Sequence, residues 1–228
     1  GITERLVAMS RAWIGHRRAG LAQANIATNM FMGAISGSAL ADLAAIGSMM
    51  IPAMKREGYS PAFCVAVTAC AAMVAPIIPP SIIAVIYGSV TGVSIGALFL
   101  GGAIPGITAG LVLMLITWLL APRAGGRPLP RTPLPEALRA TVRAVPALVM
   151  PVLIIGGIVS GAFTPTEAGA IAALYALIFG LVMRRHTAAS LYGNLANAVL
   201  TTSAALVTLA GAALFGWVLA RDGAGIAA

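Results

Sequence analysis

The stretch Gly33-Ala-Ile-Ser-Gly-Ser-Ala-Leu-Ala-Asp42 decides the fold that we expect for this chain. It joins two apolar segments, residues 19–35 and 39–54, in which Asp42 is the only charged residue. Gly37 can adopt backbone angles that other residues resist, and Ser38 is a good helix N-cap. Asp42 then falls near the first turn of the second helix, where the helix dipole favours a negative charge. The sequence therefore predicts a helical hairpin whose tip is Ser36-Gly37-Ser38.

The composition indicates an integral membrane protein. Hydrophobic residues make up 60% of the chain and charged residues only 9%, whereas a soluble domain carries roughly 25% charged residues. The apolar segments are long, which predicts a polytopic, all-α helical bundle. The net charge of +8 does not indicate nucleic-acid binding, because the arginines lie in short loops without interleaved aromatic residues. We expect this charge to set the topology and to contact anionic headgroups of the lipid bilayer.

The basic residues also predict how the hairpin is oriented. Arg17 and Arg18 precede its first segment, and Lys55 and Arg56 follow its second. Basic loops stay on the cytoplasmic side, so both ends of the hairpin are expected there and the hairpin is re-entrant. Irregular backbone at membrane depth is tolerated only where protein buries it or where it lines a cavity. We therefore expect the tip to help form an ion or substrate site, preceded by an interfacial amphipathic helix over residues 3–18.

A second interruption follows in Pro76-Ile-Ile-Pro79-Pro80-Ser81, between an apolar helix over 61–76 and an apolar run that resumes at Ile82. Three prolines remove three backbone donors, which predicts one span broken in its middle, as in the binding sites of secondary transporters. The alternative is a loop between two short segments, although neither segment is long enough to cross a bilayer. Sodium prefers oxygen ligands. The candidate ligands are therefore the hydroxyls near the two interruptions and the one carboxylate: Ser36, Ser38, Thr68, Ser81 and Asp42.

The remaining chain alternates spans and polar segments. We expect a long span over 95–121, a proline- and arginine-rich cytoplasmic loop with an amphipathic tail over 122–143, and three further spans, 144–161, 168–183 and 195–220. The basic cluster Arg184, Arg185 and His186 fits that topology. The boundary between two structural halves is placed at 143/144. The first half, 1–143, then holds the hairpin and the broken span, and the second, 144–228, holds three spans. Cys64 and Cys70 lie six residues apart in one helix, so a disulfide between them is not expected.

Thr164, Thr166 and Glu167 have two interpretations. A threonine N-cap, Pro165 at the first helical position and Glu167 at the third form a capping box, which is purely structural. Alternatively, an isolated carboxylate close to a span is a candidate binding group. An intramembrane hydrolase using Asp42 and Glu167 is one alternative function, and a non-transporting scaffold whose polar residues only pack helices is another. No Ser-His-Asp set and no metal-ligand spacing is present, so we assign no catalytic residues and no metal beyond a sodium site.

Three motifs together resemble the large membrane subunit of the TRAP transporters, the tripartite ATP-independent periplasmic family. They are the hairpin pattern from Phe31 through Ser36-Gly37-Ser38-Ala39 and Asp42 to Ile51-Pro52, the break Ile78-Pro79-Pro80-Ser81, and the run from Gly157 through Thr164-Pro165-Thr166-Glu167. The resemblance covers essentially the whole chain. It places Ser36, Gly37, Ser38, Ile78, Pro79, Pro80 and Ser81 in one half of the sodium and substrate region.

The resemblance implies a fold of two inverted repeats that works as an elevator. It implies a non-enzymatic, sodium-driven permease of the bacterial inner membrane that imports organic acids such as C4-dicarboxylates or sialic acids. Its implied partners are a small membrane subunit and a periplasmic substrate-binding protein. It implies sodium as the coupling ion and no cofactor. The opening spans, the second hairpin and the second proline break are not among these residues, so we interpret the chain as an internal piece of a longer protein.

Overall fold

The structure is a computed structural model that describes residues 1–182 and 188–221. These residues form nine helices and no β-strand, which confirms the all-α fold. The helices are α1 (Ile2–Ile14), α2 (Gly20–Ser36), α3 (Ala39–Arg56), α4 (Pro61–Val74), α5 (Ile82–Thr91), α6 (Ile95–Ala124), α7 (Leu134–Val159), α8 (Pro165–Val182) and α9 (Ala188–Arg221). The chain divides into two compact units, Gly1–Tyr175 and Ala176–Ala228. The site lies entirely in the first unit.

Within the described residues, four helices are long and apolar enough to cross a membrane: α6, α7, α8 and the Leu191–Val218 part of α9. α4 and α5 are shorter apolar helices that follow one another across the proline segment. The expected interruption of this span is therefore confirmed. Arg184, Arg185 and His186, expected to form a basic end, lie outside the described residues.

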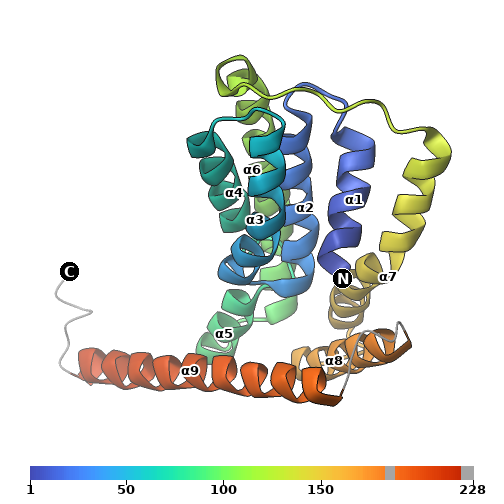
Figure 1. Cartoon of the computed structure of the whole chain (residues 1–228). Helices are drawn as coiled ribbons and strands as arrows, with labels where there is room; N and C mark the ends of the chain where they lie inside the picture. Colours follow the sequence, from blue (N-terminus) through green and yellow to red (C-terminus); the bar gives the residue numbers. More distant parts are fainter. Residues whose placement is uncertain (183–187, 222–228) are drawn as a thin grey trace. The chain divides into compact units, whose positions relative to one another are not determined.

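Helix α2 occupies the centre of the first unit. It contacts α1, α3, α4 and α6, and Figure 1 shows it between these neighbours. A helix that is covered on most sides needs mostly apolar residues all round, and the polar side chains that α2 does carry, among them Gln23, Asn25 and Asn29, are buried and hydrogen-bonded. The main core joins α2, α3 and α4 through buried side chains that include Leu21, Ile26, Ile46, Met50, Cys64 and Val67. Cys64 is buried, Cys70 is exposed and both are free, as expected.

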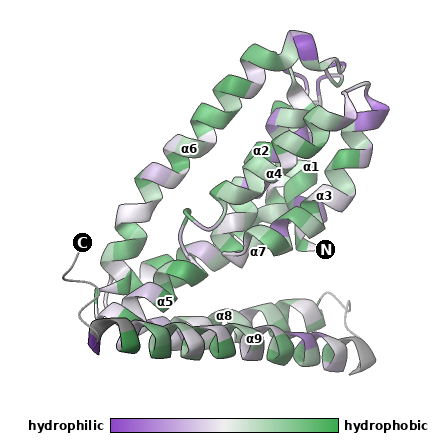
Figure 2. Ribbon diagram, turned by 90° about the vertical axis from the view of Figure 1, so that its left-hand side faces the viewer, coloured by the Kyte–Doolittle hydropathy of each residue, from purple (hydrophilic) through white to green (hydrophobic). Residues whose placement is uncertain are grey.

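The basic loops gather at one end of this unit. Backbone hydrogen bonds join the loops there: Arg127 N–H donates to the Glu57 carbonyl at 3.0 Å, and Leu129 N–H donates to the Gly15 carbonyl at 3.0 Å. Figure 2 shows hydrophilic residues concentrated where α3 and α6 end, with a mostly hydrophobic α6 leading away. Both ends of the hairpin therefore share one end of the unit with the arginine-rich linker, as predicted.

Tyr59 is buried in the same loop region, with only 3% of its surface exposed. Burial raises the pKa of its phenol above the ordinary value, and the backbone of Leu21 opposes part of that shift. Its hydroxyl has no hydrogen bond of normal geometry within the described part of the chain. The ring stacks on Phe63, with 6.0 Å between centroids. Tyr59 therefore packs the basic end as an aromatic side chain.

One expectation about the linker is corrected. The amphipathic tail expected inside a loop over 122–143 is instead the first part of α7, which runs without interruption from Leu134 to Val159. Its apolar face packs on α1, where the buried residues Leu6 and Met9 meet Ala144 and Ala147. The segment 134–143, expected as the tail of a loop, is thus helical and continuous with the apolar span that follows it. The boundary placed at 143/144 lies within this helix and stays a prediction.

Candidate functional site

The hairpin tip has the local structure that its sequence predicts. Gly37 ends α2 with φ +60°, and its N–H donates to the Gly33 carbonyl at 3.0 Å. Ser38 caps α3, because its hydroxyl accepts from the Ala41 N–H at 3.4 Å. The Ser36 hydroxyl accepts from the Ser38 N–H at 3.2 Å. Side chains thus satisfy part of the backbone that the interruption leaves without helical partners.

Asp42 is buried within the first turn of α3. Its Oδ1 accepts a hydrogen bond of 2.6 Å from the Ser36 hydroxyl, whereas Oδ2 has no hydrogen-bond partner among the described residues. A buried carboxylate is costly unless it is paired or hydrogen-bonded. The helix dipole offsets part of this cost, and one oxygen remains available to a cation or a donor.

The proline break has a similar construction. The regular helix stops at Val74 and resumes at Ile82, where the buried Ser81 accepts from the Ala84 N–H at 3.3 Å. Ile78 is buried and fits against α6, since a Cβ on Gly106 would lie 2.8 Å from Ile78 Cγ1. The break is therefore held between α6 and the hairpin.

The two interruptions are in direct contact. A Cβ added to Gly37 would lie only 2.9 Å from the carbonyl oxygen of Pro80 and 3.2 Å from the backbone nitrogen of Ile82. One turn earlier, a Cβ on Gly33 would lie 2.6 Å from the Cα of Ala75. Glycines at these two positions allow α2 to approach the break more closely than any other residue would. The prediction that the tip and the break lie together is confirmed.

Two cavities open beside this contact. One, of about 300 Å³, is lined by Ser36, Pro80 and Ser81 together with side chains of α5, α6, α7 and α8. The other, of about 440 Å³, lies on the α5 and α6 side of the break and is lined by Pro79, Ser81 and Tyr87 among others. Neither cavity is lined by an arginine or a lysine. Both are mostly apolar hollows whose polar side-chain groups are the hydroxyls of Ser36, Ser81 and Tyr87.

Sequence reasoning missed the contribution of α7 and α8. Ile154 and Ile158 of α7, and Pro165 and Gly169 from the start of α8, line the smaller cavity. Nothing in the local sequence distinguishes Ile154 and Ile158 from other apolar span residues, whereas Pro165 belongs to the Thr164–Glu167 motif, which was interpreted as a helix cap. Their role depends on a tertiary arrangement that brings residues more than 110 positions apart to the hairpin tip.

Thr68 lies elsewhere, between α2 and α4. Its hydroxyl donates to the Cys64 carbonyl at 2.6 Å and accepts from Asn25 Nδ2 at 2.7 Å. Asn29 Nδ2 donates to Asn25 Oδ1 at 2.9 Å, while Asn29 Oδ1 is buried without a partner in the described chain. Thr68 thus belongs to a polar cluster between α2 and α4, away from the tip, and a ligand role for it stays a prediction. Asn25 and Asn29 were missed, although two buried amides one turn apart in an apolar segment are a visible signal.

The Thr164 segment forms the predicted capping box. Glu167 Oε2 accepts from both the N–H and the hydroxyl of Thr164 at 2.8 Å, and Thr164 Oγ1 accepts from the Glu167 N–H at 3.3 Å. Thr164, Thr166 and Glu167 are all exposed. The structural interpretation is confirmed, and a binding role for these residues stays a prediction. Asp42 and Glu167 each have their own hydroxyl partner, Ser36 and Thr164.

Long apolar helices, a helical hairpin and a broken helix that meets its tip define a helical membrane transporter. The sequence profile of the family described as "Tripartite ATP-independent periplasmic transporter, DctM component" matches residues 1–227. The chain belongs to this family. This family consists of transporter components, and the curated relatives named below are permeases, so the comparisons give no support to the hydrolase alternative.

Curated relatives agree. The chain is 39% identical over 225 residues to the sialic acid TRAP transporter large permease protein SiaM of Vibrio cholerae serotype O1, covering 97% of this chain and 52% of that protein. It is 38% identical to the 2,3-diketo-L-gulonate permease YiaN of Escherichia coli K12 (96% and 52%). It is 41% identical to the C4-dicarboxylate permease DctM of Pseudomonas aeruginosa (81% and 43%). The chain therefore spans about half the length of the curated relatives it matches.

Proposed function

We propose that this chain is part of the membrane-spanning subunit of a sodium-coupled secondary transporter that imports an organic carboxylate. The transporter would work in the bacterial inner membrane with a small membrane subunit, and a periplasmic binding protein would deliver the substrate. The family description supports the tripartite, periplasmic arrangement. A fold of two inverted repeats moving as an elevator is part of the same proposal.

The contact between Gly37 and the break carries the proposal. It joins two interrupted helices whose polar atoms are mostly acceptors: the Ser36 and Ser81 hydroxyls, the Pro80 carbonyl and Asp42 Oδ2. Unwound carbonyls beside half-helix ends are the groups that coordinate sodium in secondary transporters. We assign the ion-binding role to Ser36, Gly37, Ser38, Asp42, Pro80 and Ser81, with Ile78 and Pro79 shaping the break.

The substrate class rests on a different argument. The three relatives named above transport sialic acid, 2,3-diketo-L-gulonate and C4-dicarboxylates, and all of these carry a carboxylate. An anion needs positive charge or donors, and neither cavity beside the break is lined by lysine or arginine. Bound sodium, together with groups from the rest of the protein, would supply this charge. Substrate binding would then depend on sodium.

Uptake into proteoliposomes tests the proposal with the full-length protein, its small subunit and its binding protein. Carboxylate uptake is measured with an inward sodium gradient and with choline replacing sodium. Asp42→Asn is the informative variant, because Ser38 and Ser81 also cap helices and their loss would cost stability. Glu57→Gln is the matched control, since Glu57 ends the same helix at its other end.

Sodium-dependent uptake by wild type and Glu57→Gln, with loss in a normally assembled Asp42→Asn protein, supports the proposal. Such a loss would also exclude the scaffold alternative. Uptake that proceeds equally in choline would overturn sodium coupling, and normal sodium dependence in Asp42→Asn would overturn the assignment of Asp42.

A further inference from the structure

A charged pocket lies between α1 and α7, and none of the residues that line it belongs to the hairpin. Its volume is about 470 Å³. Three arginines line it, with two alanines and two glutamates: Arg5, Arg139, Arg143, Ala8, Ala140, Glu4 and Glu136. The sodium site proposed above uses none of these residues.

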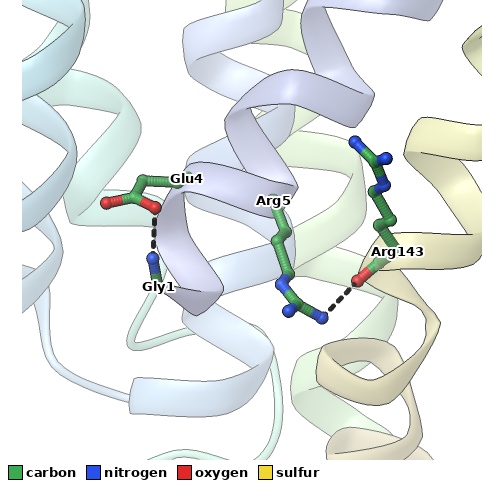
Figure 3. A network of polar contacts seen from close by, with 4 residues as sticks. All are labelled: Gly1, Glu4, Arg5 and Arg143. Carbon is green, nitrogen blue, oxygen red and sulfur yellow. Dashed lines mark hydrogen bonds and ion pairs between the residues drawn. The ribbon is translucent and has the colours of Figure 1, made fainter. Parts of the chain in front are cut away.

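Two of the arginines present their charges to the pocket. Arg139 and Arg143 are exposed, lie one helical turn apart on α7 and have no side-chain partner in the described parts of the chain. Residues at this spacing have Cβ atoms about 5–6 Å apart, so two guanidinium groups can reach one phosphate. Of the carboxylates, Glu4 lies in the first turn of α1, beside Gly1 in Figure 3, and Glu136 lies in the first turn of α7.

The walls of the pocket are tied together. Arg5 Nη1 donates to the backbone carbonyl of Arg143 at 3.1 Å, and Figure 3 shows the Arg143 side chain extending away from this contact. Trp13 Nε1 donates to Thr141 Oγ1 at 2.8 Å. These bonds, together with the apolar contacts of Leu6 and Met9, hold α1 against α7. The pocket is therefore preorganised.

Its position along α7 matches the headgroup level of a membrane. The continuous apolar part of α7 begins at Ala144, directly after Arg143, and the helix starts at the basic end of the unit. Trp13 is 44% exposed beside the pocket, and tryptophan is enriched at membrane–water interfaces. Basic pockets at that level bind anionic lipid headgroups.

Apolar surface for an acyl chain starts next to the arginines. Val142, three residues from Arg139, is 68% exposed. The exposed apolar stripe continues along α7 to a groove of about 330 Å³ lined by Val145, Leu148, Val149, Val152 and Leu153. A phosphate bound at Arg139 and Arg143 would therefore have a hydrophobic path beside it.

We propose that the pocket between α1 and α7 binds the phosphodiester headgroup of an anionic membrane phospholipid, with Arg139 and Arg143 as its ligands. A free phosphoryl anion has the same chemistry as the headgroup, but it has no acyl chain that would contact the apolar stripe. The proposal does not rest on the proposed function, because it concerns neither sodium nor substrate.

Native mass spectrometry of the delipidated full-length protein tests this. Dioleoylphosphatidylglycerol and dioleoylphosphatidylcholine are titrated against wild type and R139Q/R143Q. Each arginine near a phosphate contributes about one factor of five in affinity, so the double variant is expected to bind phosphatidylglycerol about thirtyfold more weakly. R123Q/R127Q is the matched control, because it removes the same charge from exposed positions near the same end. R139K/R143K keeps both charges and is expected to retain most of the affinity.

Preference for phosphatidylglycerol in wild type and control, lost only in R139Q/R143Q, supports the proposal. Equal binding of the two lipids by wild type would overturn it and indicate that another part of the longer protein fills the pocket. An equal loss of affinity for phosphatidylglycerol in R139Q/R143Q and R123Q/R127Q would show that binding depends on the overall charge and not on this pocket. Displacement of the lipid by excess inorganic phosphate would reassign the pocket to a small anion.

Discussion

Replacing Gly37 by alanine tests whether the hairpin tip and the proline break form one unit. Gly37 adopts φ +60°, and a Cβ there would lie 2.9 Å from the Pro80 carbonyl oxygen, closer than real Cβ atoms approach. Gly92 offers a control in the same kind of position. It ends α5 with φ +74°, its N–H donates to the Gly88 carbonyl at 2.9 Å, and nothing lies within 4 Å of an added Cβ.

The two substitutions share one cost and differ in another. Placing alanine in the left-handed region costs about 1–2 kcal/mol at either site. Only at Gly37 must backbone also move, and forcing extra volume into packed structure costs about 1–3 kcal/mol more. The expected loss of stability is thus about 2–5 kcal/mol for Gly37→Ala and about 1–2 kcal/mol for Gly92→Ala. The clash pushes the tip away from the break, so the cation site proposed there should open as well.

Thermal unfolding of the full-length protein in detergent measures both effects, in sodium chloride and in choline chloride. Wild type and Gly92→Ala are expected to melt at higher temperature in sodium, because a ligand that binds the folded state stabilises it. Gly37→Ala should melt lowest and lose the difference between the two salts. Equal destabilisation by the two alanines would refute the contact argument. A sodium effect that survives in Gly37→Ala would refute the location of the cation.

Three further outcomes are expected in the same melting assay. Thr68→Val should cost about 1–2 kcal/mol, because it leaves a buried amide N–H without its hydroxyl acceptor, whereas Thr108→Val at an exposed position should cost less than about half of that. Gly106→Ala should cost about 1–3 kcal/mol through its clash with the break, while Gly101→Ala, with open space around it, should be neutral or slightly stabilising. Tyr59→Phe should be neutral, or stabilising by up to about 1 kcal/mol, at pH about 7, because the buried hydroxyl has no partner in the described chain. Burial also raises the pKa of this phenol, so the wild type should lose stability as the pH rises above about 10, and the variant should not lose stability from this cause.

Local chemistry made the two interruptions predictable. Gly37 and Ser38 are a helix terminator and a helix cap in adjacent positions, and the three prolines after Val74 cannot continue a helix. Such signals depend only on neighbouring residues, so the observed helix ends fall within a few positions of the expected ones. That the interruptions meet could be inferred because exposed backbone polar groups in an apolar body need partners.

Other features depend on packing and carry no local signal. The arginine-rich segment before Ala144 is helical and is hydrogen-bonded to α1 through Thr141 and Arg143, and sequence reasoning had no means of pairing these two helices. The same holds for Ile154 and Pro165 at the smaller cavity. Thr68 was assigned to the site because it is a hydroxyl in an apolar helix, but its partner Asn25 lies within the hairpin. The role of Thr68 as an ion ligand stays a prediction, and residue type alone does not show where in the fold this hydroxyl lies.

The chemistry of the two interruptions argues for a cation at their contact. Each proline in the break contributes a carbonyl but no N–H, so the segment has more acceptors than donors. At the tip, the Ser36 hydroxyl is already committed as a donor to Asp42, and Asp42 Oδ2 remains buried without a partner in the described chain. A surplus of buried acceptors is stabilised by a positive ion and is repelled by an anion. If the substrate is a carboxylate, as proposed above, it should therefore bind here only after the cation has entered, and the proposed sodium coupling would follow from how the helices are interrupted.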